Sequence, residues 1–270
     1  MLASKYAECK DSIVFPCLSQ PKLDGHRCSC QVKDGKCTLW SKKREPILSM
    51  PHIVAAIEAL NFTNINLDGE LYRHGYTIED LSHYIRSATP VIGHEIVQIH
   101  LYDININQSM GMRSAALSCI KAKLKPDSPI VIVNTVKIKS EADIDVFFNK
   151  CIADKYEGCM LRNEDSVYLS VPPPGRSRDL VKVKKMDDGE FKILDINPGN
   201  GKFIDCAIFT CELPNKGTVD VSMSGPLADR KKYLDNPKSY IGKDLTVQYQ
   251  GFTKLGSLKF PVGLRIREDI

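Results

Sequence analysis

The chain has 270 residues, of which 43% are apolar and 26% charged, so it is no intrinsically disordered polypeptide and can form one large domain or a large and a small one. Its formal net charge of +4 is mildly basic, which permits a nucleic-acid partner without requiring one. No stretch approaches the roughly 20 apolar residues of a membrane span, and the opening MLASKYAECKDS lacks the apolar run of a signal peptide, so we expect no membrane association.

Strand and helix patterns alternate up to about residue 186. In chain order they predict strands at 13–18, 26–32 and 36–41, a helix at 50–60, a strand at 64–72, a helix at 78–87, a strand at 95–104, a helix at 111–125, a strand at 129–138, a helix at 141–156 and a strand at 158–163. Pro51 suits the first turn of its helix, and Thr77 with Asp80 forms a helix N-cap pattern. These elements predict an α+β domain.

The pattern changes after Met186–Gly189, where we expect a hinge. Strands are predicted at 190–196, 206–213 and 218–224, a helix at 226–237, and strands at 244–253 and 258–267. Five strands with one helix between the third and the fourth are typical of a small OB-fold β-barrel. We therefore expect two domains, residues 1–186 and residues 187–270.

The ten cysteines are scattered along the chain, and none forms a C-x-x-C pair with metal-binding spacing. A chain of this size needs no disulfide staples. We interpret them as reduced thiols of an intracellular, reducing compartment, and the spacing disfavours a structural zinc site.

The segment PKLDGHR places Lys22 in front of Asp24, Gly25 and Arg27. A lysine is a nucleophile only when its amine is deprotonated, so neighbouring cations or burial must lower its pKa from about 10.4. An attack on phosphorus also needs cations around the phosphates and carboxylates that hold a metal. An aromatic ring to stack on the base completes the expected set.

Lys22–Arg27 resembles motif I (K-x-D-G-x-R) of the covalent nucleotidyltransferases, the class of DNA ligases and mRNA capping enzymes. Further segments resemble the other motifs of this class in the same order: Ser41-Lys42 after motif I, Leu67–Leu71 as motif III, Leu101–Asp103 as motif IIIa, Tyr156–Arg162 as motif IV and Leu180–Lys184 as motif V. The last thirty or so residues resemble the OB domain of minimal viral and phage-like ATP-dependent DNA ligases. The resemblance implies an ATP-grasp-like nucleotidyltransferase (adenylation) domain with antiparallel sheets and flanking helices, followed by the OB domain.

The resemblance also implies roles for the residues that match the nucleotide-binding motifs. Lys22 would form lysyl-AMP, with Asp24 and Arg27 positioning it and contacting the ribose or the phosphate. Glu70 would meet the ribose, and Tyr102 would stack on adenine.

The later motifs supply the charges. Glu157, with Glu70, would bind Mg²⁺ (Mn²⁺ being tolerated), and Lys182 and Lys184 would hold the α-phosphate of ATP. Lys42 and Arg176 would grip the 5′-phosphate of a nick in duplex DNA. The expected protein is a monomer that acts on nicked duplex DNA without an evident protein partner, and ATP is favoured over NAD because the extra domains of NAD-dependent ligases have no counterpart here.

Two departures from the family concern the C-terminal part. In motif VI, Arg265 and Asp269 match, but Ile270 stands where close relatives have a basic residue, and Arg267 could replace it because it lies one strand period from Arg265. The first two barrel strands are joined only by NPGNGKFID, so the long hairpin that closes some minimal ligases around DNA is not expected. DNA binding should then depend on phosphate contacts and be sensitive to salt.

Each motif has a plainer interpretation when it is taken alone. Asp24-Gly25 and Asp68-Gly69 could be turns, Tyr102 a core residue, Gly158 a helix C-cap, and Lys182 with Lys184 a solvated strand edge. Taken jointly and in order, they favour a ligase that seals 5′-phosphate/3′-hydroxyl nicks through lysyl-AMP and a DNA-adenylate. The alternatives are a capping-type guanylyltransferase and a non-catalytic DNA-binding protein that contains an OB domain.

Overall fold

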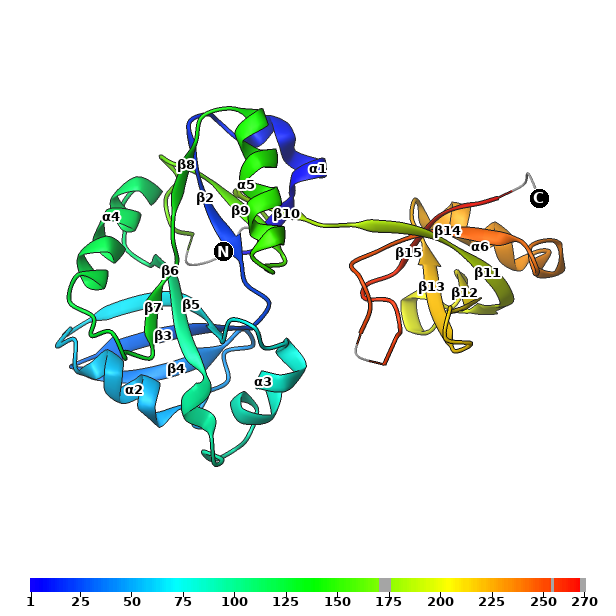
Figure 1. Ribbon diagram of the computed structural model, residues 1–270. Helices are drawn as coiled ribbons and strands as arrows, with labels where there is room; N and C mark the ends of the chain where they lie inside the picture. The colour runs from blue at the N-terminus through cyan, green and yellow to red at the C-terminus, as the bar shows by residue number, and fades with distance from the viewer. Residues whose placement is uncertain (170–175, 254, 268–270) are drawn as a thin grey trace. The chain divides into compact units, whose positions relative to one another are not determined.

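The computed structural model describes residues 1–169, 176–253 and 255–267. The chain divides into two compact units, Met1–Val183 and Lys184–Ile270 (Figure 1). Within the described ranges, no helix combines the length and the apolar character needed to cross a bilayer. All ten cysteines are free thiols, and most of them are buried.

The first unit contains a five-stranded sheet in the order β4-β3-β5-β6-β7. Its strands are β3 (His26–Lys33), β4 (Lys36–Ser41), β5 (Ile65–Tyr72), β6 (Gln98–Ile104) and β7 (Ile130–Ile132). Its pairs are antiparallel except for β6 and β7. Because side chains alternate along a strand, one face carries core residues such as Cys28 and Leu67, and the other carries Arg27 and Asp68.

Three helices pack on the apolar face of this sheet: α2 (Pro51–Glu58), α3 (Ile78–Ile85) and α4 (Met110–Lys121). Helix α2 has Pro51 in its first turn, and α3 begins with the predicted capping box, in which Thr77 and Asp80 bond each other's backbone N–H groups. Because these helices cover only the apolar face, the polar face with Arg27 and Asp68 stays open to line a cavity.

A second five-stranded sheet of the first unit has the order β1-β10-β9-β2-β8. It consists of β1 (Ala3–Lys5), β2 (Cys17–Lys22), β8 (Val136–Ile138), β9 (Gly158–Asn163) and β10 (Ser177–Lys184). Strand β2 pairs antiparallel with β8 and β9, whereas β1 and β10 are parallel. Helix α5 (Glu141–Ala153) packs against this sheet through Ile144, and the short helix α1 (Tyr6–Cys9) adds Tyr6 and Cys9 to the same core.

Two expected strands of this unit were wrong in detail, and one strand was missed. The strand expected at 129–138 is two strands, β7 and β8, which belong to different sheets; a continuous apolar run cannot reveal that the chain changes sheets within it. The strand expected at 13–18 begins at Cys17, directly after Pro16, which has no N–H to donate to a ladder. Strand β1 was not predicted at all.

The second unit is a closed barrel in the order β11-β12-β13-β15-β14, which confirms the expected OB-type barrel. Its elements are β11 (Asp187–Pro198), β12 (Ala207–Glu212), β13 (Thr218–Met223), α6 (Leu227–Lys231), β14 (Asp244–Tyr249) and β15 (Val262–Ile266). Phe191, Phe209, Val221 and Leu245 lie in its core. Residues 199–206 join β11 to β12 through the 3-10 turn Gly201–Phe203, so this connection is short, as predicted.

The hinge expected at 186–189 is narrower than the sequence indicated. Asp187, Asp188 and Gly189 already belong to β11 and pair with residues 247–249 of β14. Only Lys185 and Met186 lie between β10 and β11. The run M-D-D-G looks like a turn, but its last three residues are held by the barrel ladder.

Candidate active site

Lys22 is the last residue of β2, and strand pairing brings it to the motif IV segment. Lys22 lies opposite Gly158 in the register of β2 and β9, and the Glu157 N–H donates to the Lys22 carbonyl oxygen at 3.1 Å. The Lys22 ammonium forms an ion pair with the Glu157 carboxylate. Two residues that are 135 positions apart in sequence are therefore neighbours at the end of one ladder.

A cavity of about 320 Å³ opens beside Lys22, and the residues that line it belong to the first unit. Of the residues predicted for the site, it is lined by Lys22, Arg27, Lys42, Glu70, Tyr102, Arg176 and Lys182. Cationic groups from motif I, from the Ser41-Lys42 element, from motif V and from Arg176 thus surround one space next to Lys22. The arrangement suits a polyanionic ligand such as a nucleotide.

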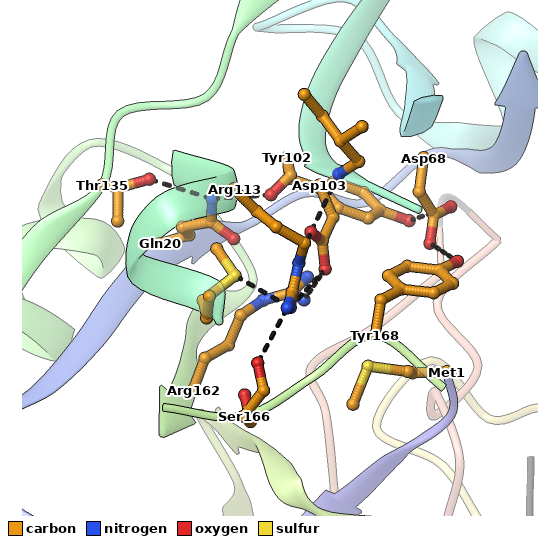
Figure 2. Close-up of polar contacts among 12 residues, drawn as sticks. Met1, Gln20, Asp68, Tyr102, Asp103, Arg113, Thr135, Arg162, Ser166 and Tyr168 are labelled. Atoms are coloured by element: carbon orange, nitrogen blue, oxygen red, sulfur yellow. Dashed lines mark hydrogen bonds and ion pairs between the residues drawn. The ribbon is translucent and has the colours of Figure 1, made fainter. Parts of the chain in front are cut away.

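Asp68 organises one wall of this cavity (Figure 2). Arg27 donates to both carboxylate oxygens, from Nε to Oδ1 at 3.0 Å and from Nη2 to Oδ2 at 2.8 Å. The Tyr102 hydroxyl donates to Oδ1 at 3.3 Å, and the Tyr168 hydroxyl donates to Oδ2 at 2.8 Å. Four donors therefore satisfy a carboxylate that is only 4% exposed.

Tyr102, the predicted base platform, is held on both its backbone and its ring. Its carbonyl oxygen accepts from Gln20 Nε2 at 3.0 Å, and the guanidinium carbon of Arg162 lies 5.5 Å from the ring centroid. Burial and the neighbouring Asp68 carboxylate raise the pKa of Tyr102 well above its ordinary value, so its hydroxyl stays a donor. A fixed ring at the cavity wall is what stacking on a base requires.

Behind this wall lies a buried ionic cluster, also drawn in Figure 2. Asp103 accepts from Arg113 Nε at 2.6 Å and from Arg162 Nη1 at 2.5 Å, and both Asp103 and Arg113 are fully buried. Arg113 also donates to the carbonyl oxygens of Gln108 and Ser166. The cluster ties β6, α4, β9 and the segment before Tyr168 together, so it fixes the frame of the cavity.

Glu70 lies on β5 at the cavity, two residues from Asp68. Burial raises the pKa of the Glu70 carboxyl to about 8, although the nearby Lys22 ammonium lowers it. Near neutral pH this carboxyl is therefore largely protonated and can donate a hydrogen bond as well as accept one, and a cation held beside it would favour the charged carboxylate.

Two glycines of the motifs allow strands to approach closely. Asp68-Gly69 is not a turn, because both residues lie within β5, and a Cβ at Gly69 would lie 2.7 Å from the His100 carbonyl oxygen on β6. A Cβ at Gly25 would lie 2.5 Å from the Leu71 carbonyl oxygen. The glycine of each D-G pair is thus required by backbone packing.

Other predicted residues lie elsewhere. Asp24 is half-buried between β2 and β3 and is absent from the described lining of the cavity. Lys184 is the last residue of β10 and the first residue of the second unit, where its ammonium donates to Gln250 Oε1 at 3.0 Å and lies 5.7 Å from the Phe260 ring centroid. Their assigned roles remain predictions.

The motif VI residues belong to the second unit. Arg265 lies on β15, and Arg267 follows it with Nη1 3.5 Å from Glu190 Oε1. Asp269 lies outside the described residues.

Five residues of the site had no role predicted from the sequence: Gln20, Asp68, Asp103, Arg162 and Tyr168. Three of them lay inside the quoted motifs, where Asp68 precedes the motif III glycine, Asp103 ends motif IIIa and Arg162 ends motif IV. Gln20 and Tyr168 carried no motif signal, and only the fold brings them to the cavity walls.

A family comparison identifies this arrangement. Residues 1–184 match the family described as ATP dependent DNA ligase domain, and residues 198–267 match the DNA ligase OB-like domain. The chain belongs to the ATP-dependent DNA ligase family. The resemblance to minimal viral and phage-like ligases is confirmed, and the two matched regions fall on the two structural units.

Curated relatives of this ligase-family chain are viral and phage proteins. The DNA ligase of African swine fever virus (isolate Pig/Kenya/KEN-50/1950) is 26% identical over 85% of this chain, and the DNA ligase of Enterobacteria phage T6 is 21% identical over 100% of it. The aligned region is 58% of the African swine fever virus ligase and 68% of the phage T6 ligase. The chain thus spans little more than half the length of the first of these relatives.

Solved ligase structures share the fold. A Lig E DNA ligase, described as binding DNA with a minimal scaffold, aligns with a TM-score of 0.79 and 24% identity over 99% of this chain and 98% of its own. The Chlorella virus DNA ligase-adenylate aligns with a TM-score of 0.55 and 20% identity over 100% of this chain and 98% of its own. At these identities the likeness establishes the fold of this family member.

Proposed function

We propose that this chain is an ATP-dependent DNA ligase that seals 5′-phosphate/3′-hydroxyl nicks in duplex DNA. The observation that carries the proposal is the position of Lys22 beside a cavity whose walls hold Arg27, Lys182 and Tyr102. A strand-end lysine in ion-pair contact with Glu157, surrounded by cations and a fixed aromatic ring, suits covalent nucleotidyl transfer.

The first step is self-adenylation. The neutral Lys22 amine attacks the α-phosphorus of ATP, the N–P bond forms, the Pα–O bond to pyrophosphate breaks, and the amine loses a proton. Glu157 is in contact with that amine and is placed to receive the proton. Lys182 and Arg27 offset the charge on the α-phosphate, and Glu70 is the proposed partner of the ribose.

Adenine is the base that the cavity favours. Gln20 lines the cavity and donates from Nε2 to the Tyr102 carbonyl oxygen and to Thr135 Oγ1, each at 3.0 Å, so its Oε1 is the proposed acceptor from the base. Adenine carries an exocyclic amino donor where guanine carries a carbonyl acceptor. This difference argues for ATP and against the capping-type guanylyltransferase alternative.

A divalent cation is expected, and the carboxylates suit Mg²⁺. Mg²⁺ is usually held by one or two carboxylates together with substrate phosphates, and not by a cage made of protein alone. In the described part of the chain no cluster of three or more His, Cys, Asp or Glu side chains forms such a cage. Glu157 and Glu70 would hold the ion, which would neutralise phosphate charge; Mn²⁺ should substitute.

The two later steps use DNA. An oxygen of the nick 5′-phosphate attacks the phosphorus of lysyl-AMP, the P–N bond breaks, the departing nitrogen takes up a proton, and a DNA-adenylate forms. The 3′-hydroxyl then attacks the 5′-phosphorus of the DNA-adenylate, AMP leaves and the hydroxyl proton is lost. Lys42 and Arg176 are the proposed ligands of the 5′-phosphate, and both line the cavity.

The remaining proposals concern the whole chain. The barrel would move about Lys185 and Met186, with Arg265, Arg267 and Asp269 serving the pyrophosphate in the first step. Lys184 would serve the α-phosphate and Asp24 the nucleophile. We infer a monomer with nicked duplex DNA as its partner.

The test is labelling with α-³²P-ATP or α-³²P-GTP in the presence of Mg²⁺. Wild type should give an acid-labile, gel-stable adduct with ATP, Lys22→Ala should give none, and Lys36→Ala, which changes a lysine at the start of β4 with an 84% exposed side chain, should label like wild type. Chelation of the metal should abolish the adduct. Nick sealing should be present or absent in the same variants and conditions as the adduct with ATP. Labelling by GTP alone would support the guanylyltransferase, and no adduct with either nucleotide would support the non-catalytic DNA-binding protein.

A further inference from the structure

A second cavity adjoins the cavity of about 320 Å³ beside Lys22, which we call the nucleotide cavity, and the two share lining residues. The second cavity encloses about 530 Å³ over the polar face of β3, β4 and β5, and Trp40, Lys42 and Arg44 are among its lining residues. Arg27, Lys42 and Asp68 line both cavities. These side chains can therefore contact a group bound in either cavity.

Asp68 separates the two cavities and receives one tyrosine hydroxyl from each. Tyr102 lines the nucleotide cavity and donates to Oδ1 at 3.3 Å, whereas Tyr168 lines the second cavity and donates to Oδ2 at 2.8 Å (Figure 2). Arg27 contacts both oxygens, and its Nη2 also lies 3.4 Å from the Tyr168 hydroxyl. The Asp68 carboxylate thus accepts from the lining of the nucleotide cavity through Oδ1 and from the lining of the second cavity through Oδ2.

The Tyr168 ring is held from behind. The guanidinium carbon of Arg113 lies 5.8 Å from its centroid, and Arg113 itself is fixed by the buried Asp103. Burial and the neighbouring Asp68 carboxylate raise the pKa of Tyr168, so its hydroxyl is a donor at neutral pH.

We propose that Tyr168 is a positioning residue for the transfer of AMP to DNA, acting through Asp68 and Arg27 on the side from which the nick 5′-phosphate enters. This inference rests on the proposed ligase function. In the transfer, a 5′-phosphate oxygen bonds to the adenylate phosphorus, the bond from that phosphorus to Lys22 Nζ breaks, and the nitrogen takes up a proton.

The physical reason is the charge that the entering phosphate meets. The Tyr168 hydroxyl, from the lining of the second cavity, donates to the same Asp68 oxygen that accepts from Arg27 Nη2, so it shares the charge of that oxygen with Arg27. Without that hydroxyl, Asp68 Oδ2 keeps only Arg27 Nη2 as its donor among the described residues, and its less compensated charge repels a dianionic phosphate that approaches Lys42. The formation of lysyl-AMP uses the opposite side of Asp68, where Tyr102 is the matching donor.

The test compares Tyr168→Phe with Tyr102→Phe, because each change removes one hydroxyl from one oxygen of the same carboxylate. Two single-turnover rates are measured: lysyl-AMP formation without DNA, and AMP transfer from preformed enzyme-adenylate to a 5′-phosphate nick. In Tyr168→Phe the ratio of transfer to adduct formation should fall roughly tenfold, the scale of a lost hydrogen bond to a charged group. In Tyr102→Phe the ratio should rise.

A binding measurement separates positioning from general damage. Wild type should bind a nick with a 5′-phosphate more tightly than the same nick with a 5′-hydroxyl, and Tyr168→Phe should lose most of this preference while its thermal midpoint stays close to that of wild type. Equal slowing of both rates, or an unchanged preference, would overturn the role of Tyr168. A wild type that forms no adduct would instead overturn the ligase function itself.

Discussion

At the scale of single residues, the site depends on carboxylates that are shared by several donors. Asp68 holds Arg27 and two tyrosine hydroxyls at the cavity, and Asp103 holds two arginines behind it. One carboxylate facing two buried guanidinium groups leaves net positive charge next to the cavity. That charge is compatible with a polyanionic ligand, and it makes Asp103 structurally costly to lose.

Asp103→Asn should therefore be strongly destabilising, because it leaves Arg113 and Arg162 without their anion in a buried place. We expect a loss of about 3–5 kcal/mol in the free energy of unfolding, the range for breaking a buried ion pair. Urea denaturation measures it. Glu141→Gln removes an exposed partner of Lys10 and should leave the denaturation midpoint unchanged. Equal effects of the two substitutions would refute the structural role of the cluster.

His100 gives the fold a dependence on acid. It is 8% exposed, and burial lowers the pKa of its imidazole to about 4 from the ordinary value of 6.5. As the pH falls, the imidazole of His100 is protonated in the unfolded chain before it is protonated in the folded one. The contribution of the neutral imidazole to the free energy of unfolding is therefore complete above about pH 6.5 and is lost progressively down to about pH 4.

Denaturation of wild type and His100→Gln at several pH values tests this. The difference between their unfolding free energies should shrink by up to about 1.4 kcal/mol per pH unit as the pH falls through this window. His83→Gln, which changes an exposed histidine on α3, should follow wild type throughout. A difference that does not depend on pH would argue against a buried neutral imidazole.

At the scale of elements, sequence patterns predicted the strands and helix ends that depend on neighbouring residues alone. The alternation of 26–32 and of 36–41 matches β3 and β4, and the Thr77–Asp80 cap begins α3. What the sequence could not reveal is which strand joins which sheet. The division of 129–138 between two sheets and the pairing of β2 with β9 depend on contacts between residues far apart in the chain.

In the site, too, local motifs could be predicted from the sequence, whereas contacts between distant residues could not. Residues that carry a motif, such as Lys22, Glu70 and Tyr102, could be named in advance, and they line one cavity. Tyr168 could not, because its role depends on a carboxylate 100 positions away. A strand pattern also cannot show that Lys184, at the end of β10, packs with the barrel.

The contact between β5 and β6 gives a test at this scale. Gly69→Ala should destabilise the protein by about 1–3 kcal/mol, the usual cost of overpacking, since the added Cβ meets the backbone of His100. Gly111→Ala is the matched control: its Cβ would lie 3.3 Å from the flexible side chain of Glu164 and 3.8 Å, an ordinary contact, from the Glu164 carbonyl oxygen, and alanine favours the helix α4. Thermal denaturation should show a lower midpoint for the first and an equal or higher midpoint for the second. A mild effect at Gly69 would mean that β5 and β6 can separate.

At the scale of the whole molecule, each unit has its own core, so binding and chemistry can be distributed over separate bodies. The second cavity presents Lys42 and Arg44 beside neutral polar residues such as Gln31 and Asn66. The short connection between β11 and β12 offers no long hairpin to enclose DNA. Affinity for DNA should then come largely from phosphate contacts.

Such binding must weaken steeply with salt, since each phosphate contact releases counterions from the DNA. Lys42→Gln should weaken binding to nicked duplex DNA and make the slope of log K against log salt shallower by about 1, the value for one phosphate contact. Lys121→Gln removes the same charge from α4, which packs on the opposite face of the sheet, and should leave the slope unchanged. The measurement is a titration of labelled nicked DNA at several salt concentrations. An affinity for DNA that stays the same between low and near-physiological salt would mean that phosphate contacts do not dominate binding. Equal slopes for Lys42→Gln and wild type would mean that Lys42 does not contact a DNA phosphate.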